Sequence, residues 1–146
     1  MEDPRLPEDG VFPIQVRVWT RWSDEDCQDV LNNAVYLTLL EEARFAWCRE
    51  QGLLEDGRRF PFVLARTNLR FVSPGRGGEE LVVEFAVTSV GRSSFVQASR
   101  IRTPEGELRA EAEALLVAWD NRRGRKAETL EPGLRAALEG AMRRPA

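Results

Sequence analysis

The sequence predicts an α+β domain in which a largely antiparallel sheet packs against one long helix. Two observations support this prediction. A stretch with helical periodicity follows the first strand-like stretch, and four further stretches with strand-like periodicity come after it, separated by short turns. Strands joined by tight turns run antiparallel, so the sheet is expected to be largely antiparallel with the helix on one face.

The first strand and the long helix lie on either side of a short acidic segment. Ile14, Val16 and Val18 alternate with polar residues, which is typical of a strand with one buried face. Between residues 36 and 51 apolar residues recur at helical spacing, and Gly52 is a typical C-terminal stop. The apolar surface of this helix is broad, so we expect it to be covered on more than one side.

The four later strands are predicted at residues 60–72, 81–90, 95–102 and 107–119. The last of these is ambiguous, because its Ala, Glu and Leu content favours a helix. Its alanines at 110, 112 and 114 nevertheless fall on one face of an alternating pattern, and a tight turn precedes them. We interpret it as a strand whose small side chains let the helix approach closely. Residues 132–142 resemble a short amphipathic helix.

The chain is long enough for one domain with its own core. Its 146 residues are 42% hydrophobic and 31% charged. We interpret residues 1–12 as a flexible tail, residues 13–130 as the domain and residues 131–146 as a C-terminal helix and tail. No signal peptide and no run of eighteen uncharged apolar residues is present, which predicts a cytoplasmic protein without a membrane span. A net charge of -3 argues against a nucleic-acid binder.

The chain contains no histidine. This excludes the serine–histidine–aspartate and cysteine–histidine arrangements and a histidine general base. A zinc site would lack most of its usual ligands, and the two cysteines, Cys27 and Cys48, are interpreted as reduced thiols. Any catalysis would therefore depend on carboxylates or amides.

Residues 22–36, WSDEDCQDVLNNAVY, gather acids immediately before the predicted helix. This segment resembles the active-site segment of hotdog-fold acyl-CoA thioesterases, in the branch similar to 4-hydroxybenzoyl-CoA thioesterase, whose pattern is Asp-x-Asp-x-x-Gly-His-Val-Asn-Asn-x-x-Tyr. Three later pieces also match: Pro74, Gly91–Ser94 and Asp120–Arg125. Two positions depart from the pattern, because Asp29 replaces the glycine and Val30 the histidine. The resemblance implies a hotdog fold, in which a curved antiparallel sheet wraps one long central helix.

The resemblance also implies a set of site residues. Asp26 matches the catalytic acid, as either nucleophile or general base, and backbone amides of Asn32 and Asn33 would bind the carbonyl oxygen at the helix N-terminus. Further contacts are expected from two residues to the acyl substrate and from six to coenzyme A: Tyr36 and Trp22, then Arg92, Ser93, Ser94, Arg122, Arg123 and Arg125. Plainer interpretations stay open: Asn32 as a helix cap, Tyr36 as core and the arginines as solvated loops.

The implied reaction is hydrolysis of an acyl-CoA thioester to a carboxylic acid and free coenzyme A, with no metal and no cofactor. The resemblance further implies a homodimer or homotetramer in which the substrate contacts two protomers. A non-catalytic acyl-CoA sensor is the alternative, which the replaced residues at 29 and 30 leave open. A hotdog dehydratase is disfavoured, because the resemblance implies that its site uses a histidine and this chain has none.

Overall fold

A computed structural model describes residues 12–142 of the chain. Its elements in order are β1 (Ile14–Trp19), the short 3-10 helix η1 (Trp22–Asp24), α1 (Asn33–Glu50), β2 (Phe62–Phe71), β3 (Glu80–Val90), β4 (Ser94–Arg102), β5 (Leu108–Asp120), β6 (Arg125–Lys126) and α2 (Pro132–Gly140). The predicted order of strand, long helix, four strands and short helix is confirmed. The two-residue strand β6 was not predicted.

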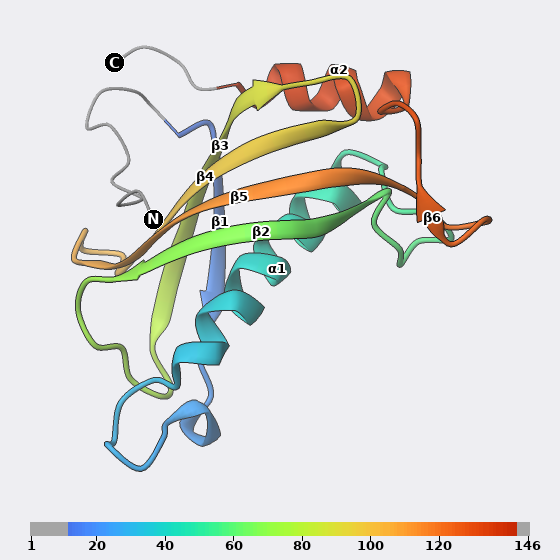
Figure 1. The fold of residues 1–146 in the computed structure, drawn as a ribbon. Helices are drawn as coiled ribbons and strands as arrows, with labels where there is room; N and C mark the ends of the chain where they lie inside the picture. The colour runs from blue at the N-terminus through green and yellow to red at the C-terminus, as the bar shows by residue number, and fades with distance from the viewer. Residues whose placement is uncertain (1–11, 143–146) are drawn as a thin grey trace.

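The strands form one antiparallel sheet in the order β1-β3-β4-β5-β2, with β6 paired to the end of β5. The sheet curves around α1, and α2 lies across the end of β3 and β4 (Figure 1). The predicted α+β class with a curved antiparallel sheet is therefore confirmed. Strands β1 and β2 are the two edges, and each is hydrogen-bonded to only one neighbour in the main sheet.

The core lies between α1 and the concave face of the sheet. Leu81, Val83, Phe85 and Val87 alternate along β3 and are all at most 1% exposed, as the period-two pattern predicts. The ring of Phe85 meets that of Trp47 on α1 edge-on, with 5.8 Å between centroids. Aromatic and aliphatic packing thus anchors the helix to β3.

The ambiguous segment forms β5, in agreement with the alternating pattern. It pairs with β4 on one side and β2 on the other, so its backbone groups are satisfied by two neighbours and pairing overrides its helix propensity. The alanines at 110, 112 and 114 point inward and are buried. A register shift between Leu64 and Arg66 interrupts the partner strand β2.

The predicted boundary of the N-terminal tail needs a correction. Phe12, which we assigned to the tail, is 3% exposed and clusters with Ala86 and Ala98. The rest of the predicted tail, residues 1–11, and the last four residues lie outside the described part of the chain. No helix within residues 12–142 is long and apolar enough to cross a membrane.

Candidate active site

The acidic segment forms a loop, residues 20–32, that joins β1 to α1 and folds back on itself. The Asp26 amide donates to the Val30 carbonyl and the Asn32 amide to the Asp24 carbonyl, both at 2.9 Å. An isolated antiparallel bridge between Glu25 and Leu31 lies inside these two bonds. The chain therefore reverses between Asp26 and Val30, so that Asp24 pairs with the Asn32 cap of α1 and Asp26 with Val30. The loop as a whole lies at the N-terminal end of α1 (Figure 1).

Asp26 is partly buried, and its carboxylate is held by its own loop. Its Oδ1 accepts a hydrogen bond of 2.8 Å from the Gln28 amide, an arrangement in which an aspartate side chain closes a turn. The Asp29 amide donates to the Asp26 carbonyl at 3.0 Å, which closes the same turn a second time. The second carboxylate oxygen forms no hydrogen bond within residues 12–142, so one oxygen orients the group and the other is free to react.

The N-terminus of α1 lies at the end of this loop. The Asn32 side chain caps the helix by accepting from the Ala34 amide at 2.9 Å. The amide of Asn32 itself donates to Asp24, so of the two predicted carbonyl-binding amides only that of Asn33 has no acceptor within the described chain. One exposed N–H group is thus left at the positive end of an 18-residue helix.

The acid at position 24 has a structural use. Its carboxylate accepts from the Arg21 amide at 2.8 Å and from the Arg21 guanidinium at 2.9 and 3.2 Å. These bonds, the guanidinium first, hold the pKa of Asp24 below its ordinary value. Asp24 is 8% exposed, so it stabilises the loop from a buried position and is not accessible to a substrate.

Asp29 keeps the backbone conformation that a glycine would give. Its φ is +60°, in the left-handed region that aspartate tolerates better than most residues. The departure from the family pattern at this position therefore leaves the turn intact. The Asp29 carbonyl also accepts a hydrogen bond of 2.6 Å from Arg76.

The two predicted acyl contacts lie in opposite environments. Tyr36 is 2% exposed, its hydroxyl accepts from the Gly75 amide at 3.2 Å, and its ring packs edge-on against Phe71. Trp22 is 85% exposed. Within one chain, Tyr36 is therefore part of the core, while Trp22, which belongs to the loop, presents a large apolar side chain to the solvent.

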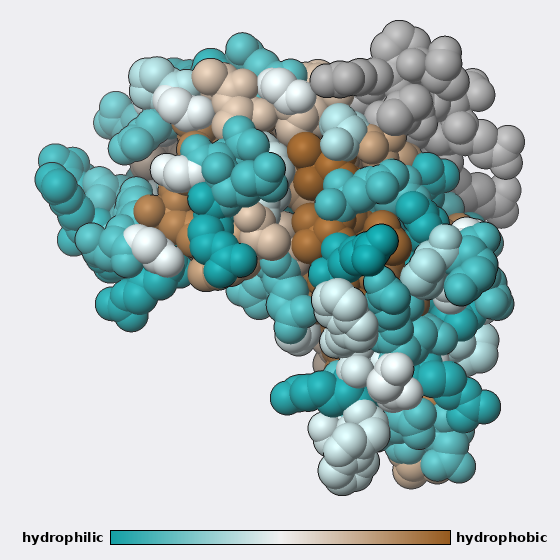
Figure 2. Space-filling model, turned by 180° about the vertical axis from the view of Figure 1, so that it is seen from behind, coloured by the Kyte–Doolittle hydropathy of each residue, from teal (hydrophilic) through white to brown (hydrophobic). Residues whose placement is uncertain are grey.

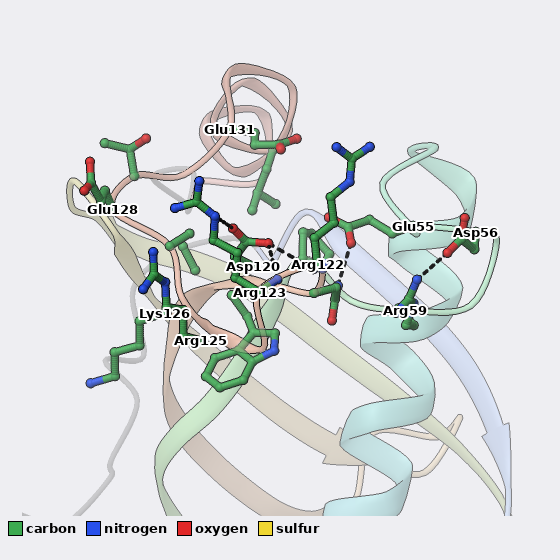
Figure 3. A pocket seen from close by; sticks show the side chains of 17 residues that line it. Glu55, Asp56, Arg59, Asp120, Arg122, Arg123, Arg125, Lys126, Glu128 and Glu131 are labelled. Carbon is green, nitrogen blue, oxygen red and sulfur yellow. Dashed lines mark hydrogen bonds and ion pairs between the residues drawn. The ribbon is translucent and has the colours of Figure 1, made fainter.

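Three of the predicted coenzyme A contacts, Arg122, Arg123 and Arg125, line a cavity of about 1130 Å³ at the opposite end of α1. This arginine-rich cavity lies between the loop after α1, the β5–β6 turn and the start of α2 (Figure 3). Asp120 accepts from the backbone amides of Arg122 and Arg123 at 2.9 and 3.1 Å, which shapes the turn. Arg59 and Lys126 also line the cavity, and no sequence signal pointed to Arg59 because it lies about sixty residues away.

The other predicted coenzyme A contacts lie at the turn between β3 and β4, with Arg92 and Ser93 in the turn and Ser94 as the first residue of β4. The Arg92 carbonyl accepts from the Leu130 amide at 2.9 Å, and the Ser93 carbonyl accepts from the Ala118 amide at 2.8 Å. Ala118 also lines the arginine-rich cavity, which places this turn behind its wall. Arg92, Ser93 and Ser94 themselves do not line it.

A second, smaller cavity of about 460 Å³ adjoins the first along α1. It is lined by both apolar and charged residues, and the two cavities share Arg59, Trp119 and Asn121. Its remaining lining residues are Thr38, Glu41, Glu42, Phe45, Arg58, Phe60, Phe62 and Val63. Asp26 lines neither cavity, so the predicted acid and the predicted nucleotide contacts lie at opposite ends of one chain.

Comparison with known proteins places this geometry in a family. The model of the thioesterase superfamily matches residues 28–110, which is more than half of the chain. The chain belongs to the thioesterase superfamily. Across 115 residues it is 30% identical to the acyl-CoA thioester hydrolase YbgC of Escherichia coli O6:H1, covering 75% of this chain and 83% of that protein.

Solved thioesterase structures share the fold. A thioesterase from Thermus thermophilus, complexed with coenzyme A and Zn in its crystal structure, is 31% identical with a TM-score of 0.74, covering 87% of this chain and 98% of that one. A predicted thioesterase from Bacillus stearothermophilus is 19% identical with a TM-score of 0.77, covering 91% and 98% of the two chains. The hotdog fold is confirmed. Among residues 12–142 no group of three or more Cys, Asp or Glu side chains is placed to hold a metal ion.

Proposed function

We propose that the protein hydrolyses acyl-CoA thioesters to a carboxylic acid and free coenzyme A, with Asp26 as the catalytic residue. The observation that carries this proposal is the fold of the 20–32 loop, which pairs Asp26 with Val30, two residues before the Asn32 cap of α1. Membership of the thioesterase superfamily and the relative named an acyl-CoA thioester hydrolase support the reaction class. No metal or redox cofactor takes part in this proposal.

The free amide of Asn33 supplies the electrophilic half of the reaction. Attack on a thioester carbonyl places negative charge on its oxygen, and an N–H group at a helix N-terminus stabilises such charge. A donor already in position typically contributes about 2.7–4 kcal/mol to such a transition state. The cap formed by Asn32 keeps the first turn of α1 in place, while the Asn33 amide has no acceptor among the described residues.

Asp26 supplies the other half by one of two routes. As a nucleophile its carboxylate attacks the carbonyl carbon, the coenzyme A thiolate leaves, and water cleaves the resulting mixed anhydride. As a general base it removes a proton from water, and the hydroxide attacks the carbonyl directly. A single turnover in water enriched in heavy oxygen identifies the nucleophile route: heavy oxygen enters Asp26 only when water attacks the aspartyl carbonyl of the mixed anhydride, whereas the base route labels only the product acid.

The arginine-rich cavity is the proposed site of the nucleotide part of coenzyme A. Arginine guanidinium groups match phosphate geometry, and those of Arg122 and Arg125 form no ion pair within the described chain. An 18-residue helix spans roughly 27 Å, so this cavity is remote from Asp26 of the same chain. We therefore propose that a thioester whose nucleotide is bound by one protomer is delivered to Asp26 of another.

This arrangement requires a homodimer or homotetramer, and the surface of the single chain is consistent with one. Strand β2 has one unpaired edge, and several exposed apolar side chains belong to β2, its end or α1: Leu37, Leu64, Phe71 and Val72. Seen from behind the view of Figure 1, apolar residues also reach the surface between hydrophilic regions (Figure 2). An apolar surface around an open strand edge is the kind of surface that a second copy covers.

The experiment that tests the function compares the wild type with Asp26→Asn on a panel of acyl-CoAs, following the release of free thiol. Asparagine keeps an oxygen that accepts from the Gln28 amide, so the loop is expected to stay folded while the rate falls about 10²–10⁴-fold. Because Cys27 is exposed, both proteins carry Cys27→Ser to keep the thiol signal clean. Tight acyl-CoA binding without turnover by the wild type would support the sensor instead. A cytoplasmic location stays a prediction, which cell fractionation tests.

A further inference from the structure

Residues 75–79, between β2 and β3, lie against the 20–32 loop along most of its length. We call them the brace segment. The Leu31 amide donates to the Gly75 carbonyl at 2.9 Å, and the Gly78 amide donates to the Thr20 carbonyl at 3.1 Å. The two contacts lie at opposite ends of the loop, so the brace segment bridges the end of β1 and the approach to α1.

The two segments approach as closely as backbones can. A Cβ at Gly77 would lie 2.7 Å from the Arg21 carbonyl oxygen and 2.7 Å from the Trp22 Cα. Both neighbours are backbone atoms, which do not move aside as the end of a flexible side chain does. The fit therefore requires glycine at position 77.

Two side chains join the segments on either side of Asp26. Glu25, the residue before Asp26, accepts from the Gly77 amide through Oε1 at 2.9 Å. Arg76 donates through Nη1 to the Asp29 carbonyl at 2.6 Å, three residues after Asp26. Neither residue belongs to the proposed reaction, and neither lines either cavity.

The brace segment is itself fixed to the sheet. Glu79 forms a two-pronged ion pair with Arg109 of β5, at 2.8 and 3.0 Å, and Arg109 also donates to the Ser73 hydroxyl at 3.0 Å. Arg109 is 8% exposed, so this anchor is shielded from solvent. The brace segment is thus tied to the start of β5.

From this geometry we infer that Glu25 and Arg76 are positioning residues that hold the Asp26 turn against the brace segment, in the loop that leads into α1. The inference rests on the proposed function for its kinetic consequence. Reacting groups must be held close to their productive geometry, and a displacement of about 1 Å costs on the order of 10²-fold in rate. Losing one of these two side-chain hydrogen bonds is expected to lower the rate by less, because the other one and the backbone hydrogen bonds remain.

The test compares Glu25→Ala with Glu25→Gln. Glutamine keeps an Oε1 that accepts from the Gly77 amide, whereas alanine removes the acceptor. We expect Glu25→Ala to lower kcat about tenfold with KM within about twofold, and Glu25→Gln to stay within about twofold of the wild type in both. Glu139→Ala is the matched control, since Glu139 is an exposed glutamate on α2 outside both cavities.

A second readout does not need the enzyme to be active. Hydrogen exchange at the amides of Asp26 and Leu31, which are hydrogen-bonded in the loop, should accelerate in Glu25→Ala and stay as in the wild type in Glu25→Gln. Equal behaviour of the two Glu25 variants, in rate or in exchange, overturns the inference. If the wild type has no turnover, the proposed function fails while exchange still decides the inference.

Discussion

The two ends of α1 hold their charged side chains in opposite ways. At the N-terminal end the carboxylates of Asp24 and Glu25 are bound by an arginine and a backbone amide, and Asp26 is fixed by its own turn. At the C-terminal end Arg122, Arg125 and Lys126 line an open cavity and form no ion pair within residues 12–142. Figure 3 shows these cationic side chains projecting around the cavity and not packed into the domain.

Under the proposed function, this difference would correspond to two different tasks. A group that takes part in bond making works best when its position is set before the substrate arrives, since reorganisation at the moment of reaction is costly. A site for a charged, flexible ligand works with cations that remain solvated until the ligand exchanges for water. The acids of the 20–32 loop are therefore used mostly for contacts within the loop. The cations at the other end of the helix are accessible to solvent.

The substitution with the largest expected effect on the loop at the N-terminal end of α1 is Gly77→Ala. The added Cβ would contact backbone atoms at 2.7 Å, so the brace segment and the 20–32 loop must move apart. We expect a loss of about 1–3 kcal/mol in the free energy of unfolding, as for overpacking, together with a fall in kcat. Urea unfolding and steady-state kinetics measure both. Gly78→Ala does not serve as a control, because Gly78 has a φ of +71°. Gly133→Ala does, since nothing lies within 4 Å of its Cβ position.

The other end is tested by Arg122→Gln and Arg125→Gln. Each is expected to raise KM for acyl-CoA about three- to tenfold and leave kcat nearly unchanged, because an exposed arginine contributes binding and not chemistry. The effect should shrink as salt is added. Arg17→Gln is the control, since Arg17 is an exposed arginine on β1 that pairs with Glu80 of β3. Equal effects in all three variants would contradict the nucleotide site.

The ion pair between Asp24 and Arg21 predicts how the free energy of unfolding depends on pH. Because Arg21 lowers the pKa of Asp24, the folded chain takes up the proton at lower pH than the unfolded chain. The stabilisation is fully present above the unperturbed pKa of 3.8 and is lost as the pH falls through the lowered value. Asp24→Asn should therefore cost roughly 0.5–1 kcal/mol at pH 7 and less near pH 3, measured by urea unfolding. A constant cost across this range would contradict the ion pair.

The smallest effect is expected for Asp29→Gly. Glycine relieves the left-handed backbone at φ +60° but adds freedom to the unfolded chain, so the two terms nearly cancel, to within about 0.5 kcal/mol. The Arg76 contact persists because it uses the Asp29 carbonyl. Asp29→Val, which cannot adopt this conformation easily, should cost about 1–2 kcal/mol. Thermal unfolding of the two variants side by side measures the contrast.

The sequence predicted the elements well because each has a local signal. Alternation marked β3, and it also outweighed helix propensity in β5, where two strand partners settle the outcome. The short strand β6 and the register shift near Leu64 were missed, since a two-residue strand has no period and a shift depends on the neighbouring strand. The boundary at Phe12 was wrong because its burial depends on Ala86 and Ala98, more than seventy residues away.

The sequence points to candidate site residues, but it does not show how their backbone and side-chain groups are held. The resemblance pointed to Asp26, but no sequence pattern shows that the amide of Asn32 is taken by the Asp24 carbonyl. Tyr36 proved to be core, held by Gly75 across the fold, which follows from a long-range contact. For the same reason no sequence pattern pointed to Glu25 and Arg76 as clamps, because both act on backbone atoms about fifty residues away.

The two thiols differ in a way that has a practical use. Cys27 is exposed beside Asp26, whereas Cys48 is fully enclosed and burial raises its pKa to about 12. A maleimide dye added near neutral pH should therefore attach to one position of the native, unmutated protein. Fluorescence from that dye would report directly on how the turn around Asp26 moves when a thioester arrives and when its product departs.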